Sequence, residues 1–174
     1  MKWYNLSNKR KGRKKMIFCD SFLLNMKTLM LQAVFTGSYR SKIITTQGEF
    51  FSTMTVRELL DLTCIRFAST LEGRIQASKK MMRYFNKSPI IINPGEMGAL
   101  PTKSYKAVDC IWIFNHFFHV DEISAEESLI TFRNGFSYKI PCSKYILIKQ
   151  QQRLHTLLNA YSTIKRDEEL AKEL

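Results

Sequence analysis

The dipeptide Asn134-Gly135 constrains the fold more than any other feature of the sequence, because it predicts a tight β-hairpin. It lies between two runs that are rich in aromatic and β-branched residues, 128–133 and 136–140. Asn-Gly between such runs is typical of a two-residue turn whose central residues adopt positive φ. Pro141 then ends the second strand, because proline has no amide hydrogen to donate. The chain is therefore expected to contain antiparallel β-structure and not to be an all-helical bundle.

Further strands are predicted where short apolar runs are bounded by turn residues such as Gly37-Ser38 and Gln47-Gly48. The segment 96–109 holds Gly98, Pro101 and Ser104 and is expected to be a loop. The expected strands are 29–35, 42–46, 49–53, 90–92 and 110–118.

Two of the three helical patterns begin with a recognisable N-cap. Thr55 and Glu58 have the spacing of a capping box, which predicts a well-buried helix to about residue 67. Ser143 is the expected N-cap of a long helix that runs to about Ile164.

The third helical pattern, 71–86, has two faces at 100° per residue. Ser88-Pro89 is expected to end this helix, because the residue before proline avoids helical angles. The apolar face holds Leu71, Ile75, Ser78, Met82 and Phe85, and the opposite side holds Lys79, Lys80, Arg83 and Lys87.

These elements predict one α+β domain of short antiparallel strands and hairpins, with two prominent helices near 71–86 and 143–163. Composition changes near Thr28, so residues 1–28 are interpreted as a basic N-terminal arm and 29–164 as the folded domain. Residues 165–174 are expected to form a charged C-terminal tail.

The charge distribution predicts a polyanionic partner, either nucleic acid or an acidic membrane surface. The formal net charge is +12, and the first fifteen residues carry seven Lys and Arg without an acid. Residues 74–110 carry seven more, against two acids. A coat of charges that only keeps a protein in solution would be spread more evenly, although a solvated helix face remains the alternative.

Catalytic and metal-binding patterns are not recognised, so neither an enzyme nor a cofactor is expected. The cysteines Cys19, Cys64, Cys110 and Cys142 lie far apart without a CxxC pair, which indicates reduced, buried thiols in a cytoplasmic protein. His116 and His119 would point to opposite faces of one strand, so no metal site is expected. The apolar stretch near residues 16–35 is too short and too polar to cross a membrane.

The basic residues divide into two candidate binding groups. The arm is expected to make non-specific phosphate contacts, because its charges are dense and have no apolar neighbours. Its residues are Lys9, Arg10, Lys11, Arg13, Lys14 and Lys15. The candidate DNA-binding residues of the domain are Arg66, Arg74, Lys79, Lys80, Arg83, Lys87, Lys103 and Lys106.

A chain of short motifs resembles the competence transcription factor (ComK) family in order and spacing, over about residues 29–161. The upstream strand is Ser41-Lys42-Ile43-Ile44. The central block comprises Asp61-Leu-Thr-Cys64, Arg66-Phe67-Ala-Ser69, Gly73-Arg74, Lys87-Ser-Pro89-Ile90, Pro94 and Pro101-Thr102. Trp112, His116, Phe132-Arg-Asn134-Gly135 and Pro141-Cys-Ser143 follow.

The resemblance implies a transcription activator that binds paired A/T-rich boxes of double-stranded DNA, largely through the minor groove, and switches on DNA-uptake genes. It also implies a dimer or pair of dimers, RNA polymerase and a Clp protease adaptor as partners, and a nucleoid-associated location. A dimer would use the apolar residues of the last helix, which could equally cover the domain's own sheet: Ile148, Leu154, Leu157, Leu158 and Tyr161. The alternative is a basic RNA-binding or nucleoid-associated module without promoter specificity.

Overall fold

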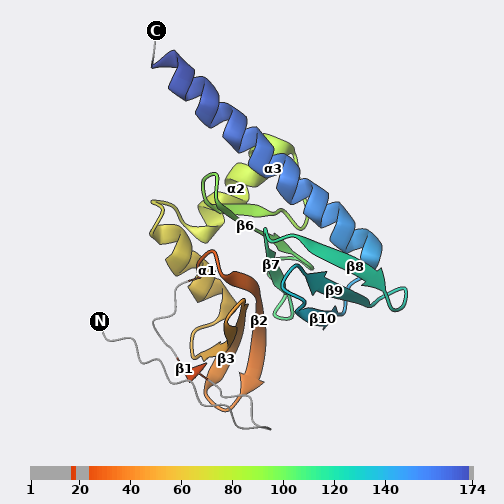
Figure 1. Cartoon of the computed structure of the whole chain (residues 1–174). Helices are drawn as coiled ribbons and strands as arrows, with labels where there is room; N and C mark the ends of the chain where they lie inside the picture. Colours follow the sequence, from red (N-terminus) through yellow and green to blue (C-terminus); the bar gives the residue numbers. More distant parts are fainter. Residues whose placement is uncertain (1–16, 19–23, 173–174) are drawn as a thin grey trace.

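Two β-sheets and three helices make up the described part of the chain, residues 17–18 and 24–172 of a computed structural model (Figure 1). In chain order the elements are β1 (Ile17–Phe18), β2 (Thr28–Thr36), β3 (Tyr39–Thr45), β4 (Gly48–Ser52), α1 (Val56–Ile65), α2 (Leu71–Met82), β5 (Ile90–Asn93), β6 (Met97–Pro101), β7 (Trp112–Phe114), β8 (Phe118–Glu122), β9 (Ser128–Phe132), β10 (Ser137–Ile140) and α3 (Lys144–Ala171). The predicted α+β class is confirmed.

The larger sheet has the strand order β1-β4-β3-β2-β7-β6-β5, and the smaller sheet has the order β10-β9-β8. Pairing is antiparallel except between β1 and β4. The predicted hairpin of β9 and β10 is confirmed, but its turn is longer than two residues. The Phe132 amide bonds to the Phe136 carbonyl (2.9 Å), and Gly135 has φ 81° whereas Asn134 does not have a positive φ.

Neighbouring residues of the larger sheet face two different cores, as the two-residue period of a strand requires. Leu31 and Ile43 pack towards α1 and α2, whereas Met30 and Ile44 pack towards the smaller sheet and the start of α3. The larger sheet is therefore the middle layer, buried on both faces. This explains why its strands read as continuous apolar runs and not as an alternating pattern.

The capping box at the start of α1 is confirmed. The Thr55 hydroxyl accepts a hydrogen bond from the Glu58 amide (3.2 Å), and the Glu58 carboxylate accepts one from the Thr55 amide (2.7 Å). That backbone hydrogen bond is the main reason why the pKa of Glu58 is lowered. The expectation that the whole helix is well buried was wrong, because Leu62 and Ile65 are exposed on its outer side.

The second helix ends earlier than predicted, at Met82, and Arg83 adopts a left-handed conformation with φ 54°. The reason lies in α3, outside the range of any local pattern. Gln150 donates a hydrogen bond to the Lys87 carbonyl (2.7 Å), and Arg153 donates one to the Asn86 carbonyl (3.0 Å). These bonds hold residues 83–88 as a turn, which satisfies carbonyl groups that a continued helix would have used internally.

Two predictions in the middle of the chain, one of a loop and one of a strand, were also wrong. The expected loop 96–109 contains β6, which lies between β5 and β7. The expected strand 110–118 is broken between β7 and β8, because the Asn115 side chain bonds to the Gly98 amide and the Glu96 carbonyl (3.0 and 2.8 Å). β7 therefore joins the larger sheet and β8 joins the smaller one.

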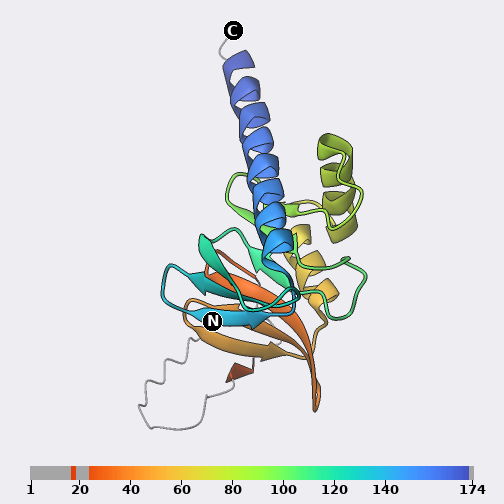
Figure 2. The same cartoon turned by 90° about the vertical axis from the view of Figure 1, so that its right-hand side faces the viewer.

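The last helix begins at the predicted N-cap, Ser143, but continues to Ala171, beyond the expected end near Ile164. It crosses β5, β6 and β8, and its C-terminal part projects past the rest of the domain (Figure 2). Gly98 permits this crossing, because a Cβ atom there would lie 2.9 Å from the Leu154 side chain and 3.0 Å from the Ile90 carbonyl oxygen.

Candidate nucleic-acid interface

Basic side chains from three separate segments surround one concave surface, which we call the basic hollow. Lys79 comes from α2, Phe85 and Lys87 from the turn 83–88, and Tyr105 and Lys106 from the loop between β6 and β7. Asn86, Ser88 and Ser104 complete its lining, and its volume is about 220 Å³. None of these lining residues is an Asp or Glu, so the hollow has a positive potential that favours an anionic partner.

Tyr105 holds two of these cations in position. The ammonium nitrogens of Lys79 and Lys106 lie 5.6 and 5.9 Å from the centre of its ring, within the range of cation–π contacts. The ring itself packs against the core beneath α1 and α2. Lys79 and Lys106, which are distant in sequence, therefore share one anchored aromatic support.

The turn 83–88 is held firmly and carries an exposed aromatic ring. The Ser88 hydroxyl donates to the Tyr84 carbonyl (2.8 Å), and the Arg153 guanidinium lies 4.7 Å from the centre of the Tyr84 ring. Phe85, between them, is 81% exposed. Its assignment to the buried face of a helix was therefore wrong, because the helix ends before it.

Both cations of this turn have unusual backbone angles. Arg83 has φ 54° and Lys87 has φ 49°, a region that costs a non-glycine residue about 1 kcal/mol or more. Such costs are concentrated at functional sites, where the surrounding structure maintains them. Glycine would be the residue of lowest energy at either position, as it would be at exposed Ala68, which has φ 54° and no charge.

The structure places the remaining candidate DNA-binding residues differently. Lys80 and Arg83 are exposed beside the hollow, at and after the end of α2, and Arg66 is exposed at the end of α1. Arg74 points inwards: it donates to the Phe67 carbonyl (2.9 Å) and lines a small cavity beneath α3. The structure thus brings Lys79, Lys87 and Lys106 together and leaves Arg66 and Arg74 apart from them.

Lys103 lies in the same loop as Lys106 but has an acidic partner. It forms an ion pair with Asp109, whose hydrogen bond raises the pKa of Lys103 and lowers the pKa of Asp109. The Asp109 carboxylate therefore neutralises the charge of Lys103, whereas Lys106 has no acidic residue beside it in the lining of the hollow. The six arm residues predicted to contact phosphates, from Lys9 to Lys15, lie outside the described residues.

Sequence reasoning missed two aromatic members of this site. Tyr105 stands between Lys103 and Lys106, and an aromatic residue among cations is a signal that could have been used. Phe85 offered no such signal, because its exposure depends on hydrogen bonds from α3.

The described cysteines have the properties of core residues. Burial raises the pKa of Cys64 to about 11, although the Arg74 charge acts in the opposite direction. Burial also raises the pKa of Cys110 to about 11 and raises that of Cys142. These groups are thiols at neutral pH, which argues against a cysteine nucleophile, since the reactive form is the thiolate.

His116 and His119 were expected to lie on one strand, but they do not. His116 lies in the break between β7 and β8, and His119 on β8 contacts Asp121 (3.1 Å). Within residues 17–18 and 24–172, no group of three or more His, Cys, Asp or Glu side chains is arranged to hold a metal ion. Over the same residues, none of the helices has the length and apolar character needed to cross a membrane.

An α+β domain that presents lysines and an exposed aromatic ring around an acid-free hollow has the character of a protein that binds polyanions. Comparison with known proteins agrees: the family described as "ComK protein" matches residues 19–166, and the chain belongs to this family. It is 30% identical over 129 residues to the "Competence transcription factor" of Bacillus subtilis (strain 168). That match covers 71% of this chain and 66% of the relative, just under two thirds of its length. No solved structure matches the chain.

Proposed function

We propose that this protein is a transcription activator of competence genes that binds A/T-rich promoter boxes of double-stranded DNA through the minor groove. One observation carries the proposal: Lys79, Lys87 and Lys106 meet around the basic hollow, and the exposed ring of Phe85 stands among them. Family membership supports it. In this role the protein binds and does not catalyse, and it works at the nucleoid with RNA polymerase. Control by a Clp protease adaptor is proposed on the family resemblance alone.

The width and the negative potential of the A/T-rich minor groove suit a surface with cations and an exposed aromatic ring. A/T-rich tracts have a narrow minor groove with a strong negative potential, which attracts inserted cations without a base-specific code. Proteins that bind there commonly insert an apolar side chain between base pairs. A short turn that carries Arg83, Phe85 and Lys87 supplies both kinds of side chain within five residues.

The same exposed ring also favours an alternative, the binding of single-stranded RNA, because unpaired bases stack on aromatic side chains. Fluorescence anisotropy with three labelled ligands at equal salt separates the two functions. We expect an A/T-rich duplex to bind at least about tenfold more tightly than a G/C-rich duplex of equal length or a single-stranded RNA. Equal affinity for the two duplexes would contradict promoter recognition, and tighter binding of the RNA would establish the alternative.

Arg83→Gly should weaken DNA binding without weakening the fold. We expect the loss on the A/T-rich duplex to be about 1–3 kcal/mol, the scale of one well-placed contact. The unfolding free energy should stay the same or rise, because glycine removes the Cβ strain at φ 54°. Anisotropy and urea unfolding measure the two effects.

Ala68→Gly is the matched control, because Ala68 is also exposed with φ 54° and has no charge to lose. It should change stability in the same direction and leave DNA affinity unaltered. Arg83→Lys should recover only part of the affinity, since an ammonium is more strongly hydrated than a guanidinium. Full affinity in Arg83→Gly would remove Arg83 from the interface.

Self-association is part of the proposal, through the projecting end of α3. Leu154 and Leu157 are buried in the domain's own core and are not available to a partner. Beyond them, Ile164 and Leu170 are exposed on the same helix. Sedimentation equilibrium at micromolar concentration should show a dimer that Ile164→Glu with Leu170→Glu converts to a monomer. A monomeric wild-type protein, with and without DNA, would contradict this.

A further inference from the structure

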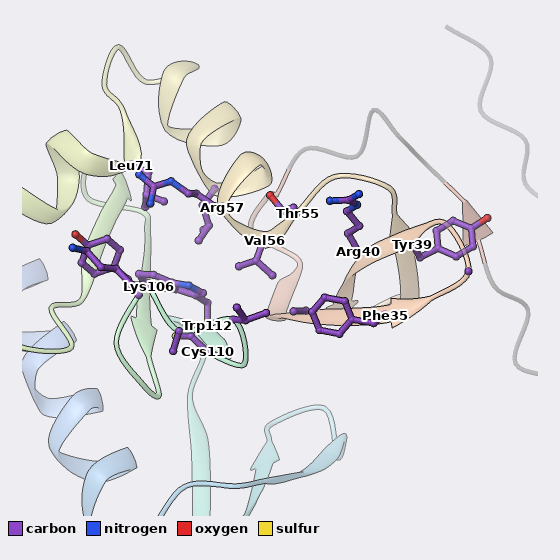
Figure 3. A pocket seen from close by; sticks show the side chains of 16 residues that line it. Phe35, Tyr39, Arg40, Thr55, Val56, Arg57, Leu71, Lys106, Cys110 and Trp112 are labelled. Carbon is purple, nitrogen blue, oxygen red and sulfur yellow. The ribbon is translucent and has the colours of Figure 1, made fainter.

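A second and larger concave surface lies on the other side of the loop that carries Tyr105 and Lys106. It opens between the β2–β3 hairpin, the start of α1 and this loop (Figure 3). Its volume is about 740 Å³, within the range of roughly 300–1,000 Å³ that small-molecule sites occupy. We call it the hydrophobic pocket.

Apolar side chains line both the inner wall and the mouth of the hydrophobic pocket. Leu60, Leu71 and Trp112 belong to the core beneath α1 and α2 and form the inner wall. At the mouth, Phe35 is 79% exposed and Val108 is also exposed. Large apolar side chains that remain open to solvent beside a cavity are typical of a binding surface.

Aromatic rings make up much of this apolar lining. Phe35 comes from the hairpin, Tyr105 from the loop and Trp112 from β7, whereas the Tyr39 ring points away from the pocket and packs on Phe51 (Figure 3). Rings stack on and pack edge-to-face against other rings, so this set favours a ligand with a flat, ring-containing body.

Three cationic side chains line the same pocket: Arg40 from β3, Arg57 from α1 and Lys106 from the loop. No Asp or Glu is among the residues that line it. The nearest acidic neighbours lie outside the lining. Glu72 approaches Arg57 only to 4.0 Å with both side chains exposed, and the Glu58 carboxylate, which accepts hydrogen bonds from Thr55, interacts electrostatically with Arg40. Solvent screens both of these exposed interactions, so the cations remain available to an anionic group.

We propose that the hydrophobic pocket binds an organic anion that has a ring-containing apolar body and a carboxylate or phosphate head. The rings of the pocket enclose the body, and Arg40 and Arg57 bind the head. This proposal stands independently of DNA binding.

Two fluorescent probes with the same kind of ring body test the proposal directly. Anilinonaphthalene sulfonate carries an anionic head, and N-phenylnaphthylamine does not. We expect one saturable site for each on the folded chain, with the anionic probe about three- to tenfold tighter, the effect of partly exposed ion pairs. Equal affinities, or no saturable binding of either probe, would overturn the proposal.

Two variants locate the site. Ala33→Phe places a ring in the pocket from β2 and should abolish binding of both probes. Arg40→Gln with Arg57→Gln should remove the preference for the anionic probe and leave the neutral probe bound. Arg133→Gln with Lys139→Gln is the matched control, since it loses the same charge from β10 and the turn that precedes it.

If the control pair loses the anionic preference to the same degree, the preference comes from net charge and the proposed head site is wrong. If folded Ala33→Phe binds both probes normally, the probes bind elsewhere and the proposal fails. Displacement of the anionic probe by naphthoate and by naphthyl phosphate then distinguishes the two head groups. Displacement by neither one would restrict the site to the sulfonate probe and reject the proposed ligand class.

Discussion

Replacing Lys79, Lys87 and Lys106 together by glutamine should lower the affinity for an A/T-rich duplex by about 500-fold at 0.1 M salt. Each lysine that neutralises a phosphate adds about 0.9 to the slope of log affinity against log salt. Loss of three such contacts therefore lowers the slope by about 2.7. Because 0.1 M salt lies one decade below the 1 M reference, the affinity at 0.1 M falls by about 2.7 decades, which is about 500-fold. Anisotropy titrations at several salt concentrations measure the slope and the affinity together.

The control variant removes the same charge elsewhere: Lys139→Gln, Lys149→Gln and Lys165→Gln, on β10 and α3. Lys139 and Lys165 are paired with Glu127 and Glu169, and Lys149 lies over the Tyr145 ring. Both triple variants should fold, because none of these ammonium groups is in the core. If the two variants lose equal affinity, only net charge matters and the basic hollow is not the interface.

Local sequence signals predicted the elements whose causes are local. The Thr55–Glu58 capping box, the Ser143 N-cap and the Asn134-Gly135 turn each depend on residues within a few positions of one another. The interactions that stabilise such features all lie within one short segment, so a pattern in the sequence identifies them.

The parts that the sequence did not predict depend on contacts across the fold. The end of α2 is set by Gln150 and Arg153, which bond to the carbonyl groups of Lys87 and Asn86 from α3. The break between β7 and β8 depends on the Asn115 side chain and its two distant backbone partners. The periodicity of the sequence does not predict these contacts, because only folding brings the partners close together.

The candidate site shows the same division. Lys79, Lys87 and Lys106 were all predicted from charge, but as a helical stripe and a separate loop. Tertiary structure brings them together, with Tyr105 beneath two of them. It also turns Arg74 inwards, a change that helical periodicity did not indicate. Charge therefore identified the three cations that line the hollow, and only the fold gave their arrangement.

Phe85→Ala should lower the affinity for A/T-rich DNA by about 5- to 150-fold, or about 1–3 kcal/mol, the scale of one aromatic ring stacked on a base. The fold should be unchanged, because the ring is 81% exposed and buries little surface. A ring inserted between base pairs unstacks them and bends the duplex. Wild-type protein should therefore bring the ends of an end-labelled A/T-rich duplex closer in energy-transfer measurements, and Phe85→Ala should not.

Phe117→Ala is the matched control, since Phe117 is also an exposed phenylalanine (62%) but lies under Arg133 beside the smaller sheet. It should leave both affinity and bending unaltered. Phe85→Leu should retain part of the bending, because an aliphatic side chain can also enter a base step, but it cannot stack on a base. Suppose that Phe85→Leu loses as much RNA affinity as Phe85→Ala but still bends the duplex like the wild-type protein. That result would assign Phe85 to the stacking of unpaired bases. Unaltered affinity and bending in Phe85→Ala would exclude the turn 83–88 as the element that enters the groove, and the basic hollow would then act through its lysines alone.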